Sequence, residues 1–289
     1  MTRFYAILIT LIAIADIWAE SAIRLYPDAK GEKAKVTLTP YPADSANNTG
    51  IAVIVCPGGS YSWLDMKTEG IGTAQWLQSN GINAYILRYR VANVSAYILG
   101  YRIFGIGNKY PDMLLDAKAA LKYVYDHSTD YNINTNTIGV MGFSAGGHLT
   151  MSSYIYNDTP YKPAFLCPIY PVVTMSDKNY THKRSRRGAL GVWRQYDKTL
   201  RDSLSIEQHI DADCPPVFLV NCKDDKTVKY QNSVLLDSAL TANNVNHKYI
   251  QYNTGGHGFG ASDTKGTDES RMWKKEFLEW ILNLHHALR

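Results

Sequence analysis

The sequence has little cysteine and little net charge, and each shortage excludes a class of protein. Only four cysteines occur in 289 residues, the first at Cys56, so a disulfide-stapled fold and a lipid-modified cysteine directly after an N-terminal leader are excluded. Thirty basic and 26 acidic residues leave a formal net charge of +4, short of the clustered basic surface of a nucleic-acid binder. We therefore expect no nucleic-acid partner.

Sequence motifs for metals and nucleotides are also missing. The chain contains no G-x-x-x-x-G-K-[ST] loop, no H-E-x-x-H and no cysteine pair at zinc-ligand spacing. Residues 105–107 read Gly-Ile-Gly but lack the third glycine and the preceding strand of a dinucleotide site. We predict neither a cofactor nor a bound metal.

The cysteines are placed as buried free thiols rather than as a disulfide framework. Cys214 and Cys222 flank one apolar run, and as ends of a strand they would stand roughly 26 Å apart at ~3.3 Å per residue, beyond the reach of a disulfide. Cys56 and Cys167 end or lie within other apolar runs, where a free cysteine behaves as a small hydrophobic residue. We expect no disulfide bond.

Residues 1–19 have the pattern of a secretory signal. Arg3 precedes an apolar stretch over 4–15, and the small Ala19 stands before Glu20. A first helix or a membrane anchor is the alternative, but the apolar stretch is shorter than the ~20 residues that span a membrane, and Asp16 interrupts it. We expect an exported protein, periplasmic or secreted, whose mature chain 20–289 has no membrane anchor.

Apolar runs and amphipathic stretches alternate along the rest of the chain, which predicts strands alternating with helices. Such alternation is typical of a mostly parallel central sheet with helices on both faces, and no repeat or linker divides residues 20–289, so we predict one α/β domain. Segments 91–110 and 174–204 break the alternation and are candidate rims of an active site. The predicted strands are 35–42, 51–56, 82–89, 137–143, 164–173, 216–221 and 247–252; the predicted helices are 69–77, 111–125, 145–156, 228–240 and a closing helix through 272–284.

A nucleophile motif stands between a predicted strand and a predicted helix. Residues 142–146 read Gly-Phe-Ser-Ala-Gly, which matches G-x-S-x-G, and this context is the one a nucleophile elbow requires. Small neighbours let strand and helix approach, and the helix N-terminus favours developing negative charge. We predict Ser144 to be the nucleophile; the alternative is an ordinary strand-to-helix turn.

A base and an orienting acid follow in the order Ser, Asp, His. Of eight histidines, only His257 lies in a glycine-rich loop directly after the last predicted strand. Asp224 and Asp225 both follow the strand before it, and we prefer Asp225 because it lies closer to the helix expected from Val228. Asp224 then faces solvent or caps the helix.

The predicted oxyanion hole is made of backbone N–H groups at two loops. Pro57-Gly58-Gly59 leaves the strand 51–56, where glycines let a substrate approach the backbone closely. The residue after the nucleophile usually supplies a further N–H group. The candidate donors are Gly58, Gly59 and Ala145.

Taken together, these motifs resemble the α/β-hydrolase superfamily, and within it the bacterial acetyl-xylan-esterase-like carboxylesterases. The resemblance runs from about residue 30 to the C-terminus and departs from the usual pattern at Ser60 instead of a third glycine, at Lys229 instead of a proline, and at the apolar insertion 91–110. The departures concern the acyl and leaving-group pockets rather than the triad. The segments that carry the resemblance are 56–61, 142–149, 170–173, 185–186 with 190–191, 224–228 with 232–233, and 256–260.

The resemblance implies a serine carboxylesterase that removes acetyl groups from plant polysaccharides such as xylan or from small esters, through an acyl-enzyme. The expected partner is therefore a small-molecule or oligosaccharide ester. Two alternatives remain: a peptidase-like hydrolase on the same scaffold, and a non-catalytic glycan-binding protein that has kept the scaffold. The basic run 182–187 is interpreted as a solvated loop, with an acidic glycan as the alternative ligand.

Overall fold

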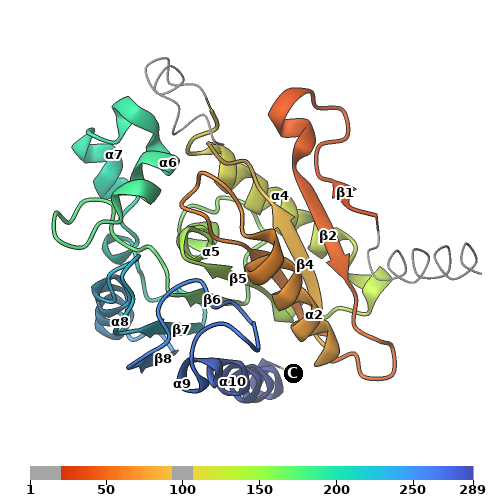
Figure 1. Cartoon of the computed structure of the whole chain (residues 1–289). Coiled ribbons are helices and arrows are strands. Elements are labelled where there is room, and N and C mark those ends of the chain that lie inside the picture. Colours follow the sequence, from red (N-terminus) through yellow and green to blue (C-terminus); the bar gives the residue numbers. More distant parts are fainter. Residues whose placement is uncertain (1–20, 93–106, 289) are drawn as a thin grey trace, which may run out of the picture.

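A single eight-stranded sheet forms the centre of the molecule, in the order β1-β2-β4-β3-β5-β6-β7-β8 (Figure 1). The computed structural model describes residues 21–92 and 107–288. The pairs β1–β2 and β2–β4 are antiparallel, and every pair from β4 to β8 is parallel, so the predicted α/β sheet is confirmed. The strands are β1 (Ile23–Arg24), β2 (Thr37–Tyr41), β3 (Ala52–Cys56), β4 (Asn83–Arg88), β5 (Ile138–Phe143), β6 (Phe165–Ile169), β7 (Val217–Cys222) and β8 (His247–Tyr252).

The central strands are apolar along their whole length because both faces of the sheet are covered. In β3, Ile54 and Cys56 pack into one apolar cluster while Val53 and Val55 pack into a second cluster on the other face. This follows from the two-residue period of a strand, whose successive side chains point to opposite faces. All five residues of β3 are buried, as a continuous apolar run predicts.

Two groups of helices cover the two faces of the sheet. Leu121 of α4, Leu149 of α5 and Leu236 of α8 belong to the first cluster. Leu77 of α2 and Phe277 of α10 belong to the second, and Figure 1 shows α2 and α10 together on the near side of the sheet. The helices are α2 (Gly72–Ser79), α4 (Asp112–Asp126), α5 (Ala145–Ile155), α6 (Lys183–Arg194), α7 (Lys198–Ser203), α8 (Gln231–Ala242), α9 (Asp268–Arg271) and α10 (Trp273–Leu288); a π-helix, Met66–Ile71, leads into α2.

Several predicted bounds are corrected by local contacts. The strand predicted over 164–173 ends at Ile169, because Tyr170 turns with φ 37° and the Val172 N–H donates to the carbonyl of Ser144, 3.0 Å away. The helix predicted from Val228 begins at Gln231, because a carboxylate oxygen of Asp225 accepts from the N–H groups of residues 227 and 228. Residues 170–173 are apolar because they are buried, not because they continue the strand.

The basic run is not a solvated loop. Residues 183–187 form the first turns of α6, where Ser185 is buried and Arg186 donates to the carbonyl of Met175. Residues 174–204 thus carry two helices, α6 and α7, and Figure 1 shows both beyond the edge of the sheet, above α5.

Some predictions fall outside the described residues. The predicted signal, 1–19, and most of the segment 91–110 are not described, and of the latter only residues 91–92 and 107–110 are placed. No helix in the described part of the chain has the length and apolar character to cross a bilayer. All four cysteines are buried free thiols.

Candidate active site

Ser144 occupies a strained turn between β5 and α5. Its backbone adopts φ 55° and ψ −116°, a conformation that an L-residue takes only when the surrounding structure enforces it. A Cβ at Gly142 would lie 2.2 Å from the carbonyl oxygen of Gly146, and a Cβ at Gly146 would lie 2.0 Å from that of Cys56. The glycines of the motif are therefore required by the close approach of helix, turn and strand.

His257 joins the serine to an acid. Its Nε2 lies 2.9 Å from Oγ of Ser144, and its Nδ1 lies 2.6 Å from Oδ2 of Asp225. A neutral imidazole that donates from Nδ1 to the carboxylate leaves Nε2 to accept the hydroxyl proton of the serine. The structure thus brings together residues that follow β5, β7 and β8. Asp225 lies 32 positions and Ser144 lies 113 positions before His257 along the chain.

The two neighbouring aspartates have different contacts. Asp225 is 8% exposed, and its second oxygen, Oδ1, accepts from the N–H groups of Thr227 and Val228, so the carboxylate is held in place on both sides. Asp224 is exposed to solvent, one of the two predicted positions, and does not cap the helix; it accepts from the N–H groups of Gly255 and Gly256, at 3.3 and 2.8 Å. Asp225 thus contacts the imidazole, while Asp224 contacts the loop that leads to it.

One of the three candidate oxyanion donors is already engaged. The N–H of Gly58 donates to Oε2 of the buried Glu69 over 2.7 Å, so it is not free for a substrate oxygen, and the prediction for Gly58 is corrected. The N–H groups of Gly59 and Ala145 meet no acceptor among the described residues. A Cβ at Gly58 would stand 2.9 Å from Cβ of Ser144, so the close packing against Ser144 requires the glycine.

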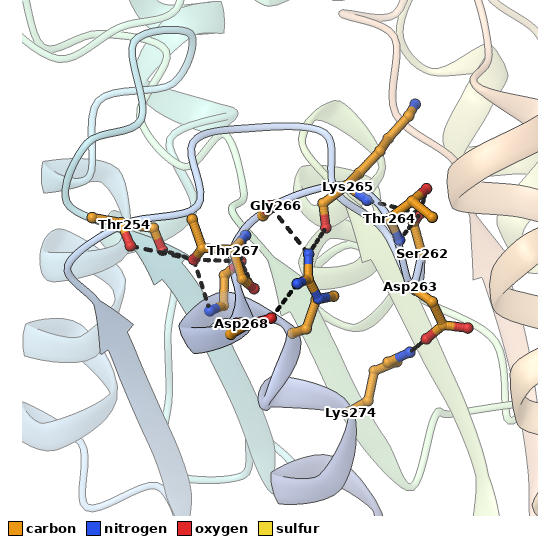
Figure 2. Close-up of polar contacts among 11 residues, drawn as sticks. Thr254, Ser262, Asp263, Thr264, Lys265, Gly266, Thr267, Asp268 and Lys274 are labelled. Carbon is orange, nitrogen blue, oxygen red and sulfur yellow. Dashed lines mark hydrogen bonds and ion pairs between the residues drawn. The ribbon is translucent and has the colours of Figure 1, made fainter.

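The loop that carries His257 is fixed to the start of the C-terminal helices, as Figure 2 shows. Thr267 and Ser270 form a capping box at the start of α9, and the hydroxyl of Thr267 donates to the carbonyl of Thr254. Lys274 pairs with Asp263 farther along the same loop. Both ends of the loop are therefore anchored, which limits the freedom of the imidazole between them.

Two other histidines are held neutral near the site. Burial lowers the pKa of His148 to about 4, and its ring bonds the Tyr61 hydroxyl and the Leu204 carbonyl, both at 2.8 Å. Burial and then the charge of nearby His257 lower the pKa of His182, at the start of α6, to about 4. Their Nδ1 atoms lie near serine hydroxyls, His182 at 2.8 Å from Ser185 and His148 at 3.4 Å from Ser152, but neither ring bonds a carboxylate among the described residues, so neither forms a second triad.

Glu69 is a buried acid that the sequence analysis did not single out. It lies in the π-helix with 3% of its surface exposed, and burial raises its pKa to about 7, against the opposing charge of His257. A lone glutamate near the start of an amphipathic stretch gives no sign of burial in the sequence, because helices normally carry acids in their first turn. In residues 21–92 and 107–288, no three potential ligands among His, Cys, Asp and Glu gather as a metal site.

Comparisons with known proteins place the chain in a family. The BD-FAE family model matches residues 41–240, more than half of the chain. The chain belongs to the BD-FAE family. An acetylxylan esterase of Xylanibacter ruminicola is 34% identical over 219 residues, which are 74% of this chain and 42% of that protein. Endo-1,4-β-xylanase B of Butyrivibrio fibrisolvens is 28% identical over 71% of this chain and 32% of its own length, so this BD-FAE chain spans less than half of either relative.

Solved structures confirm the α/β-hydrolase fold of this BD-FAE chain. An acetyl ester-xyloside bifunctional hydrolase from Caldicellulosiruptor lactoaceticus is 31% identical, covers 91% of this chain and 96% of its own, and superposes with a TM-score of 0.75. MGS-M1, an α/β hydrolase from a Medee basin deep-sea metagenome library, is 21% identical over 93% of this chain and 98% of its own, with a TM-score of 0.67. The resemblance to acetyl-xylan-esterase-like α/β-hydrolases is therefore confirmed.

Proposed function

We propose that this chain is a serine esterase that hydrolyses short-chain esters, chiefly acetyl esters of plant polysaccharides such as xylan, through an acyl-enzyme. One observation carries the proposal: Oγ of Ser144, the imidazole of His257 and the carboxylate of Asp225 form a continuous hydrogen-bonded chain. The acetyl group and the polysaccharide are inferred from relatives named as an acetylxylan esterase and an acetyl ester-xyloside hydrolase.

The geometry supports the usual two-step acyl transfer. His257 removes the hydroxyl proton of Ser144 as Oγ attacks the ester carbonyl, and Asp225 stabilises the imidazolium that forms. The N–H groups of Gly59 and Ala145 are the donors available to the oxyanion, a contribution worth ~10²–10³ in rate per donor in this type of site. The imidazolium then protonates the leaving alcohol, and a water activated by the same histidine releases the acid and regenerates the serine.

The triad is tested by a fluorophosphonate probe. We expect mass spectrometry to find an adduct on Ser144 in the wild type and none in Ser144→Ala. Ser144→Ala and His257→Ala should each lower kcat by roughly 10⁴ while the protein remains folded, because the three groups act as a unit. An unlabelled Ser144 in a protein without ester hydrolysis would favour the glycan-binding alternative. A variant that keeps a tenth of the activity would contradict the assignment of the nucleophile or the base.

The substrate class is tested by a series of p-nitrophenyl esters beside acetate release from acetylated xylan. We expect kcat/KM to fall steeply from acetate to octanoate, with acetate released from the polymer. A preference for octanoate without release from xylan would indicate a lipid-directed esterase, and cleavage of aminoacyl amides would favour the peptidase-like alternative.

Export is the remaining part of the proposal. The supporting observation is the charged, apolar and small-residue pattern of residues 1–19. N-terminal sequencing of protein recovered from the periplasm or medium should begin at Glu20, and a full-length chain retained in the cytoplasm would refute export.

A further inference from the structure

The carboxylate of Glu69 lies directly behind the oxyanion loop. Its Oε2 accepts the N–H of Gly58 over 2.7 Å, and Gly58 stands between the end of β3 and the candidate donor Gly59. Gly58 also packs against Ser144 so closely that a Cβ there would fall 2.7 Å from Oε2 and 2.9 Å from the serine Cβ. Any shift of this carboxylate therefore moves the backbone that faces the nucleophile.

The other oxygen of Glu69 leads to the histidine loop. The Tyr170 hydroxyl donates to Oε1 over 2.9 Å and accepts the N–H of Gly260 over 2.9 Å. The ring of Tyr170 lies against the imidazole of His257, with 4.6 Å between centroids. One carboxylate thus connects the loop before the nucleophile to the loop that carries the base.

The two loops are in close contact beyond this chain of hydrogen bonds. Gly260 has φ 52°, and a Cβ there would lie 2.8 Å from the carbonyl oxygen of Thr68, the residue before Glu69. Lys265 donates to the Thr68 hydroxyl over 2.6 Å, and the indole N–H of Trp273 donates to the Gly260 carbonyl over 3.0 Å. The backbone of the segment that carries Glu69 is therefore in direct contact with the backbone of the histidine loop.

We propose that Glu69 is a positioning residue for the reaction at Ser144: its carboxylate holds the oxyanion loop and the His257 loop at a fixed distance from each other. The inference rests on the proposed esterase function and adds to it a residue that touches none of the reacting atoms. Two donors converge on the carboxylate, and the N–H of Gly58 can only donate, so both bonds are made fully by the ionised form. Its burial makes the two bonds costly to lose, because a donor left without a partner there keeps its desolvation penalty.

Three variants separate positioning from simple space filling. Glu69→Ala cuts both bonds, Glu69→Gln keeps an acceptor for Gly58 and replaces the second bond by one from its amide, and Tyr170→Phe keeps the ring on His257 but removes the link to Gly260. Glu207→Gln is the control, because Glu207 is a half-buried glutamate whose pKa is also raised by burial, and it lies in the turn Ile206–Gln208 outside these contacts.

The readouts are the rate constant for fluorophosphonate labelling of Ser144 and the kcat and KM for p-nitrophenyl acetate, each per folded molecule. We expect Glu69→Ala to lower labelling and kcat by roughly 30- to 100-fold with KM within about twofold, as for a small misplacement of catalytic groups. In Glu69→Gln and in Tyr170→Phe, labelling and kcat should fall only about 3- to 10-fold, and Glu207→Gln should match the wild type. The double variant Glu69→Ala/Tyr170→Phe should be no slower than Glu69→Ala, because both changes cut the same chain of contacts.

The outcomes distinguish this inference from the proposed function. Labelling of Glu69→Ala at the wild-type rate would overturn the positioning role while leaving the esterase intact, and additive losses in the double variant would do the same. No labelling of Ser144 in the wild type would overturn both. If Glu69→Ala does not fold, Tyr170→Phe decides the question, since labelling at the wild-type rate without the Gly260 link contradicts the proposal.

Discussion

At the scale of single residues, two neighbouring acids of the same type have different positions and contacts. Asp225 contacts the imidazole of His257 at 2.6 Å, while Asp224 accepts from two backbone N–H groups of the loop that leads to it. The chain turns at residues 223–224 as it leaves β7, and the Asp225 N–H donates to the Cys222 carbonyl over 3.3 Å, so the two successive carboxylates reach different partners.

Exchanging each acid for its amide should separate their roles. We expect Asp225→Asn to lower kcat by roughly 10⁴, because an amide favours the wrong tautomer of His257 and does not stabilise the imidazolium. Asp224→Asn should lose about tenfold or less, because its amide oxygen still accepts from the loop. Steady-state kinetics on p-nitrophenyl acetate measure both, with the circular dichroism spectra compared to the wild type. A larger loss for Asp224→Asn would show that the orienting acid is misassigned.

Glu69 also gives a prediction about stability and pH. Burial raises its pKa from 4.5 to about 7, and the groups that face it are His257, Asp65, Tyr170 and Tyr89. Because its pKa is higher in the folded protein, Glu69 contributes stability that is fully present below pH 4.5 and is lost as the pH rises to about 7. At ~1.4 kcal/mol per pKa unit, the loss is on the order of 3 kcal/mol.

A comparison with Glu69→Gln isolates the pH-dependent contribution of Glu69 to the free energy of unfolding. The lowered pKa values of His148 and His182 act in the opposite direction, because these two groups lower the stability as the pH falls from 6.5 to about 4. The pH dependence of wild-type stability alone therefore combines the contributions of Glu69 and the two histidines. We expect the free energy of unfolding of Glu69→Gln, minus that of the wild type, to rise by a few kcal/mol between pH 5 and 8 in urea titrations. A difference independent of pH would mean that Glu69 does not titrate there.

At the scale of elements, the turn at Ser144 is shaped by how closely three backbones approach. α5 begins at Ala145, directly after the strained serine, and Gly146 faces the carbonyl of Cys56 at the end of β3. The amphipathic pattern of α5 is weak because nine of its eleven residues are buried between the sheet and the elements above it. The helix is held by tertiary packing rather than by one apolar face.

Two helical glycines allow a matched test of this close approach. In Gly146→Ala, the new Cβ would lie 2.0 Å from a backbone oxygen that has no room to move, so we expect a loss of about 3 kcal/mol together with slower labelling of Ser144. In Gly72→Ala, the Cβ lies 3.5 Å from its nearest neighbour, and the higher helix propensity should add up to about 1 kcal/mol. Urea denaturation measures both, and equal effects would contradict the close packing at the elbow.

At the scale of the whole molecule, the C-terminal helix connects the core to the site. Trp273, at the start of α10, is fully buried beneath the second face of the sheet, and its indole N–H holds the Gly260 carbonyl in the histidine loop. Its ring packs against Trp76 and Phe277, so one side chain belongs both to the core and to the support of His257.

Truncating this side chain should affect stability and activity together. We expect Trp273→Ala to lose roughly 3–5 kcal/mol of unfolding free energy and to slow Ser144 labelling of the molecules that remain folded. Leu282→Ala, on the exposed side of the same helix, should change stability by less than about 0.5 kcal/mol and leave labelling unchanged. If Ser144 in Trp273→Ala is labelled at the wild-type rate, Trp273 does not support the loop that carries His257.

The sequence by itself determined the alternating elements, the parallel sheet and the family, because apolar periodicity and short motifs depend on residues that are neighbours along the chain. It also pointed to Ser144, Asp225 and His257, whose motifs each stand at the end of a strand, where parallel strands bring them to one edge. Only the tertiary structure decided that the Gly58 N–H is already bonded, because its acceptor is a side chain eleven residues away whose burial no local pattern reports. The contact between Tyr170 and Gly260 joins groups 90 residues apart, so packing of distant elements, and not sequence, connects the two loops of the site.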